Sequence, residues 1–130
     1  MELTINPSIL DNNKKHIATI QDFAQLSTNW DTYNANKPSL YAIAKAVNFA
    51  KYLSDKNIDI FFTAPTPDGD VLIELKNKKA HLEFIFSEEV EDKIVASYNG
   101  DFHTEAILND TTLLSYLKWL MTYHDEHQDF

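Results

Sequence analysis

The hydrophobic period of this chain changes near residue 58 from the spacing of a helix to strict alternation. From Ile58 to Tyr98, apolar residues alternate with other residues, which places every second side chain on the same face of a strand. Polar connectors at 65–70, 77–79 and 87–92 divide this region into four runs, and they are too short for parallel crossovers. The pattern predicts four strands in an antiparallel meander with one apolar face. The alternating apolar positions are Ile58, Ile60, Phe62 and Ala64; Val71, Ile73 and Leu75; Leu82, Phe84 and Phe86; and Ile94, Ala96 and Tyr98.

Helical spacing flanks the strands on both sides. Residues 14–26 and 39–55 each keep a three-and-four apolar repeat, and Ser39 is the predicted N-cap of the second helix. A last helix is predicted after Asp110, which we take as its cap. Its predicted buried residues are Leu113, Leu114, Leu117, Leu120, Met121 and His124.

Residues 1–11 lack a clear period. Asn6-Pro7 and Asp11-Asn12-Asn13 interrupt this stretch, which predicts an extended arm.

The whole order is two helices, four strands and one helix. It predicts a single α+β domain over residues 1–130, with two N-terminal helices, a four-stranded antiparallel meander sheet and a C-terminal helix packed on the sheet.

The charge balance restricts the partners of the chain. The net charge is -9, and all eleven basic residues are lysine. Arginine is the usual residue for bidentate recognition of phosphates and bases, so this composition argues against nucleic-acid binding. Residues 1–67 hold six lysines and six acids, whereas residues 68–130 hold five lysines and fourteen acids. An acidic half can attract a basic partner, although an acidic surface that serves only solubility has the same composition.

The chain contains no cysteine. Disulfides, thiolate nucleophiles and cysteine zinc sites are therefore excluded. Residues 1–5 have neither the basic nor the apolar region of a signal peptide, and the apolar runs are too short to cross a membrane. We expect a cytoplasmic protein with no membrane association.

Acidic residues near the first strand connector are candidates for cation binding. Asp68 and Asp70, together with Asp31 and Glu74, carry the oxygen ligands that hard cations prefer. The same Pro67-Asp68-Gly69 sequence is also what a tight turn requires. The turn interpretation is the one we favour.

Histidines suggest one further candidate metal site and one candidate acid–base pair. His124 and His127 lie three residues apart and could share a metal ion, but a polar helix end has the same appearance. His103 and Glu105 could form an acid–base pair. No nucleophile motif accompanies them, and two glycines in the whole chain are too few for a phosphate loop. We predict no catalytic residue, no metal site and no cofactor.

Aromatic residues mark two candidate interaction sites. Trp30 and Tyr33 flank Asp31 in a loop. They either stack on a partner or, as we favour for Trp30, fill the gap between helices and sheet while Asp31 caps the turn. A second aromatic stripe on the last helix is either a wide core contact or an exposed interface. Its members are Tyr116, Trp119 and Tyr123.

The nominally polar face of the sheet also carries apolar residues. Phe61, Leu72 and Ile85 fall on it. We therefore expect something to cover this face, either the N-terminal arm, a helix or another subunit.

Two loops follow a recurring residue pattern. They are Asn29-Trp30-Asp31-Thr32-Tyr33-Asn34-Ala35, followed by Pro38-Ser39, and Pro65-Thr66-Pro67-Asp68-Gly69-Asp70, followed by Leu72-Ile73-Glu74-Leu75. Within residues 27–98 they resemble the N-W-D-G-Y-G-A, Pro-Ser and P-T-P-D-G-G … L-E-W pattern of a family of small, uncharacterised bacterial proteins. Thr32, Asn34 and Asp70 replace glycines of that pattern, and no tryptophan follows Glu74. The resemblance implies an α+β fold and a bacterial source. It implies no catalytic residue, because the family has no established activity.

These observations favour a small, acidic, non-enzymatic binding module that acts through a protein partner or by self-association. An antitoxin-like or immunity-like protein that masks a basic partner is one form of it. The alternative is a small carboxylate-based or metal-dependent enzyme with its site between the Trp30 loop and the Asp68 loop, which requires these loops to meet. A small-molecule carrier is a third option and requires a pocket between helices and sheet. The residues predicted to take part in interaction are Trp30, Asp31, Tyr33, Asp68, Asp70, Tyr116, Trp119 and Tyr123.

Overall fold

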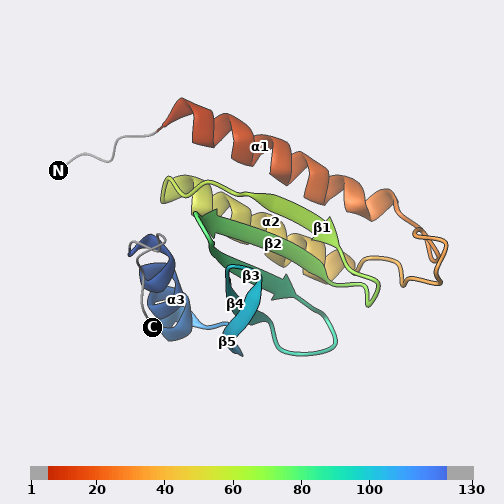
Figure 1. Cartoon of the computed structure of the whole chain (residues 1–130). Helices are drawn as coiled ribbons and strands as arrows, with labels where there is room; N and C mark the ends of the chain where they lie inside the picture. The colour runs from red at the N-terminus through yellow and green to blue at the C-terminus, as the bar shows by residue number, and fades with distance from the viewer. Residues whose placement is uncertain (1–5, 123–130) are drawn as a thin grey trace.

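Five antiparallel strands form one sheet in sequence order, β1-β2-β3-β4-β5. This computed structural model describes residues 6–122 (Figure 1) and confirms the predicted α+β class. A short 3₁₀ helix follows the first α-helix, and the sheet has one strand more than predicted. The elements are α1 (Pro7–Asp22), η1 (Phe23–Gln25), α2 (Leu40–Asp55), β1 (Phe62–Pro65), β2 (Val71–Asn77), β3 (Ala80–Phe86), β4 (Lys93–Tyr98), β5 (Asp101–Ile107) and α3 (Asp110–Met121).

One face of the sheet carries the core. Ile73 lies opposite Thr63 and Phe84, and Phe84 lies opposite Ile94, so the inward side chains form rows across the strands. Helices α2 and α3 pack on this face, and α1 packs on α2 and along β1. The core residues of the sheet are Val71, Ile73, Leu75, Ala80, Leu82, Phe84, Phe86, Ile94 and Ala96. We call the opposite face, which carries Leu72, Glu74, His81, Glu83, Ile85 and Val95, the open face, because these residues are only half-buried.

The predicted N-terminal arm is wrong, because α1 already begins at Pro7. The Asn6 side chain caps the helix by accepting a hydrogen bond from Ser8 N, and Pro7 at the first helical position has a backbone angle already suited to a helix. Asn12 and Asn13 do not break the helix. Their side chains instead bind the 58–60 segment that leads into β1.

The first strand is shorter than predicted. The alternation at Ile58 and Ile60 marks burial, but the backbone there bonds to helices rather than to a strand. Ile58 N donates to Leu53 O, and Ile60 N donates to Asn13 Oδ1. The first backbone hydrogen bond to β2 is from Phe61 N to Glu74 O, and the regular pairing begins at Phe62.

Residues 101–107, predicted as irregular, form the fifth strand. The turn at Asn99-Gly100 is confirmed, with φ values of 53° and 88°, which suit a tight hairpin. Six of the seven residues of β5 are exposed. An edge strand with little burial lacks the alternation by which sequence reasoning recognises strands.

The cap and buried face of α3 also differ from prediction. Asn109, not Asp110, is the N-cap, and it forms a reciprocal capping box with Thr112. Leu114 and Met121 are 66% and 53% exposed, whereas Tyr116 and Trp119 pack against the core. The aromatic stripe is thus a core contact in the part that the structure describes. Tyr123 and His124 lie outside the described residues.

Candidate functional site

Three loops meet at one end of the molecule, on the right of Figure 1. They are residues 27–39, 65–70 and 87–92. Asn36 N donates to Pro67 O at 2.8 Å, and Ser39 N donates to Gly69 O at 2.9 Å. Ser39 Oγ donates to Glu88 Oε1 at 2.6 Å. The loops of Trp30 and Asp68, far apart in sequence, are therefore joined.

The close approach of the first two loops depends on Gly69. Its φ of 89° lies in the left-handed region, and a Cβ there would come within 3.1 Å of Lys37 O. Both conditions favour glycine. Gly69 N also donates to Thr66 O, which closes the predicted tight turn.

The Trp30 loop is held by its own polar groups. Asp31 Oδ1 accepts hydrogen bonds from Tyr33 N and Ala35 N, so Asp31 caps the turn as predicted. Trp30 Nε1 donates to Asn36 O at 2.8 Å, and its ring is half-buried. Thr32 and Asn34 have φ values of 64° and 67°. These are two of the positions at which the pattern that the chain resembles has glycine, the residue best suited to this conformation.

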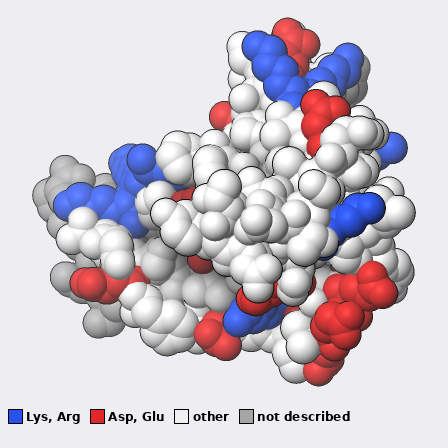
Figure 2. Space-filling view, turned by 90° about the vertical axis from the view of Figure 1, so that its right-hand side faces the viewer, with Lys and Arg blue, Asp and Glu red and all other residues white. Residues whose placement is uncertain are grey.

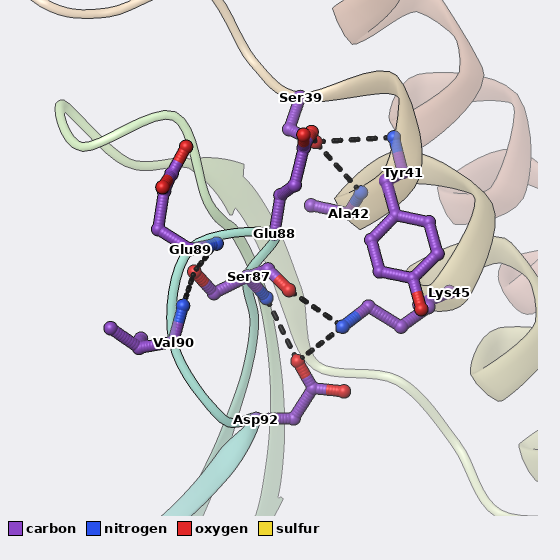
Figure 3. Close-up of polar contacts among 9 residues, drawn as sticks. All are labelled: Ser39, Tyr41, Ala42, Lys45, Ser87, Glu88, Glu89, Val90 and Asp92. Atoms are coloured by element: carbon purple, nitrogen blue, oxygen red, sulfur yellow. Dashed lines mark hydrogen bonds and ion pairs between the residues drawn. The ribbon is translucent and has the colours of Figure 1, made fainter.

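The loop at 87–92, which we call the acidic loop, is anchored by Lys45 of α2 (Figure 3). Lys45 Nζ lies 2.6 Å from Ser87 O and 2.7 Å from Asp92 Oδ1. The same carboxylate oxygen accepts a hydrogen bond from Ser87 N, and Ser87 Oγ accepts from the amides of residues 89 and 90. The loop is thus fixed from inside. Glu88 reaches toward Ser39 (Figure 3), whereas Glu89, Val90 and Glu91 are exposed.

The outward side chains are acidic with an apolar centre. Glu88, Glu89 and Glu91 are exposed, and Val90 is 67% exposed between them. Leu40 and Tyr41 of α2 are 64% and 58% exposed nearby. Figure 2 looks onto this end and shows carboxylates gathered over one part of it.

Two shallow hollows border the acidic loop. One, of about 510 Å³, is shared by all three loops, and the other, of about 630 Å³, lies between the acidic loop, α2 and the end of β5. Both are open to solvent. The first is lined by Asp68, Asp70, Ser39, Glu88 and Glu89, and the second by Tyr41, Lys45, Val90, Glu91 and Ile107.

The predicted interaction residues fall into two groups. Asp68 and Tyr33 are exposed at the loop end, where Tyr33 reaches 87% exposure. Tyr116 and Trp119 lie on α3 at the other side of the molecule (Figure 1). Trp119 stacks on His103 with ring centres 5.2 Å apart, and Tyr116 Oη lies 3.4 Å from Thr104 Oγ1. The structure therefore does not bring the two predicted aromatic groups together.

Glu74, predicted as a partner of Asp68, lies on the open face instead. Its carboxylate contacts His81 Nδ1, and the residue lies opposite Glu83 on the neighbouring strand. Partial burial and then the nearby Glu74 carboxylate raise the pKa of Glu83, while His81 opposes this shift. Among residues 6–122, no group of three or more histidine and acidic side chains is placed to hold a metal ion.

Sequence reasoning missed the acidic loop and its neighbours on α2. The run Glu88-Glu89-Val90-Glu91-Asp92 is visible as a local charge cluster, but its length and polarity are those of an ordinary strand connector. Only its place beside Leu40 and Tyr41 distinguishes it. No element of the described chain is a helix long and apolar enough to span a bilayer.

No protein-family model, curated protein or solved structure matches this chain. The resemblance to the bacterial family described above stays a prediction.

Proposed function

We propose that this protein is a non-enzymatic interaction module that binds a basic region of another protein on its loop end. The observation that carries the proposal is the acidic loop, which presents Glu88, Glu89 and Glu91 around the exposed Val90 on a backbone fixed by Lys45.

The arrangement has the composition of a binding surface. An apolar centre with a charged rim is the usual anatomy of protein interfaces, and Val90, Leu40 and Tyr41 supply exposed apolar area here. The carboxylates attract a basic partner from a distance and disfavour acidic ones. An antitoxin-like or immunity-like role is one biological setting that would use such a surface.

The rigidity of the acidic loop also favours binding. A loop that must be ordered on binding loses conformational entropy, which reduces affinity. Five hydrogen bonds from Lys45, Ser87 and Asp92 already order residues 87–92. The surface is therefore preorganised.

Selection from a library of random displayed peptides tests the proposal and does not require the partner to be identified. We expect the selected peptides to be enriched in lysine and arginine with at least one large apolar residue. The triple variant Glu88→Lys, Glu89→Lys, Glu91→Lys should lose these peptides. A matched variant with three reversals on α1 and α2, Asp11→Lys, Asp22→Lys and Asp55→Lys, should keep them. Selected peptides without positive charge, or equal loss in both variants, would contradict the proposal.

The enzyme alternative has one observation in its favour, since the Trp30 and Asp68 loops do meet. Asp68 and Asp70 line the same hollow. Asp31, however, is committed to the turn, and Glu74 to His81 on the open face. This alternative therefore rests on Asp68 and Asp70, and an activity that survives the double variant Asp68→Asn, Asp70→Asn would exclude it.

A further inference from the structure

We propose that the outer edge of β5 binds an extended, basic segment of the partner by strand addition. The inference rests on the proposed function, because it assigns a binding mode and a sequence pattern to the same class of partner.

The two edges of the sheet differ in cover. At the β1 edge, α1 packs along the strand, and His16 Nδ1 lies 3.0 Å from Thr63 Oγ1. At the other edge, β5 is the last strand in the order, and six of its seven residues are exposed. An uncovered edge strand presents unpaired backbone donors and acceptors to another chain.

The register shows which groups point outward. Leu108 N donates to Asp92 O at 2.8 Å, so these two residues form a hydrogen-bonded pair. Hydrogen-bonded pairs recur every second residue in an antiparallel ladder, and therefore include Ala106 with Ile94. The backbone N–H and C=O groups of Glu105 and the N–H of Ile107 consequently face away from β4, toward an added strand. The Ile107 carbonyl also lies on this side, but it already accepts a hydrogen bond from Thr112 Oγ1 at 2.6 Å.

The side chains of these two residues define the partner. Both lie on the open face, and Ile107 is 50% exposed. Residues directly opposite on paired strands interact most strongly, with opposite charges and apolar pairs favourable. A basic residue opposite Glu105 and an apolar residue opposite Ile107, two positions apart, fit this edge.

The proposed binding surface continues beyond the end of β5. Ile107 also lines the 630 Å³ hollow, together with Val90 and Glu91 of the acidic loop. A segment that follows β5 past Ile107 therefore runs into a mainly polar, acidic hollow, whose one lysine, Lys45, is bonded to Asp92. A second basic residue in the segment fits there.

Charge favours a basic segment over a second copy of this chain. Each copy carries a net charge of -9. Pairing the regular part of β5, residues 104–107, with the same part of a second copy places Glu105 opposite either another Glu105 or Ile107. Glu105 opposite Glu105 is a like-charge pair, and Glu105 opposite Ile107 leaves the carboxylate without a positive partner, so neither pairing is favourable. The register shift between Ala96 and Ser97 interrupts the ladder near His103, so the regular edge is short and takes a segment of a few residues.

Peptide binding followed by amide hydrogen exchange in the full chain tests the proposal. The probe is the synthetic peptide Thr-Lys-Thr-Val-Thr-Lys-Thr. With the peptide at about ten times its dissociation constant, exchange of the Glu105 and Ile107 amides should slow about tenfold. The Thr104 and Ala106 amides, already bonded to β4, should change less.

Two modified peptides with the same side chains separate backbone pairing from charge attraction. N-methylation of the valine and both lysines removes the donors that face β5 and should abolish the protection. N-methylation of the inner threonines leaves that edge intact and should preserve it. In the protein, Glu105→Lys should weaken binding of the unmodified peptide, whereas Asp11→Lys on α1 should not.

Each other outcome overturns the inference. If both methylated peptides bind equally and perturb only the amides of residues 88–91, the proposed function stands and strand addition is wrong. If no peptide binds and the displayed library also yields nothing basic, both proposals fail. If the Glu105 and Ile107 amides are protected without peptide and light scattering gives about twice the 15.0 kDa chain mass, a second copy occupies the edge instead.

Discussion

Among residues 6–122, which the structure describes, a helix packs along one edge of the sheet and no helix packs along the other. At the β1 edge, polar side chains of α1 bind the backbone of residues 58–60, and the helix shields a strand of four residues. At the β5 edge, a strand of seven residues carries mostly exposed side chains. The β1 edge requires a buried asparagine, Asn13, whose Nδ2 and Oδ1 each have a hydrogen-bond partner.

Buried polar contacts that stabilise the fold lie at one edge, and the surface that we propose for binding lies at the other. Buried polar groups such as Asn13 stabilise a fold only while every partner is present. Exposed backbone groups and carboxylates contribute little to stability and remain available to a partner. Substitutions at the β1 edge should therefore lower stability, and those at the β5 edge and acidic loop should mainly change binding.

The largest effect is expected at Asn13. Its Nδ2 donates to Ile58 O at 2.8 Å, and its Oδ1 accepts from Ile60 N at 2.9 Å. Asn13→Ala leaves both backbone groups unpaired and should lower the free energy of unfolding by about 3 kcal/mol, measured by urea denaturation. Asn48→Ala, on the exposed side of α2, is the control and should change it little. A loss below about 1 kcal/mol at Asn13 would mean that water replaces these bonds.

Proline substitutions in β5 test the direction of its backbone groups. Ala106→Pro removes an N–H that bonds to β4 and should cost about 2 kcal/mol in unfolding free energy. Ile107→Pro removes an outward N–H and should cost about 0.5 kcal/mol or less. Thermal unfolding of the two variants compares them. The reverse order would show that we have assigned the outward groups to the wrong residues.

The next largest effect on stability is expected at Lys45, which anchors the acidic loop. Lys45→Met removes the cation that holds Ser87 O and Asp92 while keeping the apolar stem. We expect a loss of about 1.5 kcal/mol in unfolding free energy and faster hydrogen exchange at the Glu89 and Val90 amides. Lys51→Met, exposed on the same helix, is the control. Unchanged exchange in the loop would show that Ser87 and Asp92 order it without Lys45.

The smallest effect concerns Glu83 on the open face, between the two edges. Its raised pKa means that the folded protein holds this proton more tightly than the unfolded chain. The resulting stabilisation is present below the ordinary pKa of 4.5 and is lost as the pH rises through the raised value. Glu83→Gln should therefore increase the unfolding free energy at neutral pH by less than about 1 kcal/mol.

The pH dependence of this gain distinguishes it from a general charge effect. The advantage of Glu83→Gln should shrink as the pH falls toward 4.5. Glu89→Gln, which removes an exposed carboxylate of the acidic loop, should show a smaller gain at neutral pH. Equal gains in both variants would point to net charge alone.

The sequence by itself determined the α+β class, the meander order of the first four strands and the positions of α2 and α3. These follow from local periodicity, because burial on one face imposes a period of two on strands and about 3.6 on helices. It also determined the turns at Gly69 and Asn99-Gly100, because few residues tolerate positive φ values.

Only the tertiary structure decided the edges and the surface. Asn12 and Asn13 look like helix breakers until their side chains meet residues 58–60 across the fold. Strand β5 is held by pairing with β4 rather than by burial of its own side chains, so no pattern reveals it. The acidic loop became a candidate surface because Lys45, Leu40 and Tyr41, more than forty residues away in sequence, lie beside it. Contacts between distant segments depend on packing, which local periodicity does not encode.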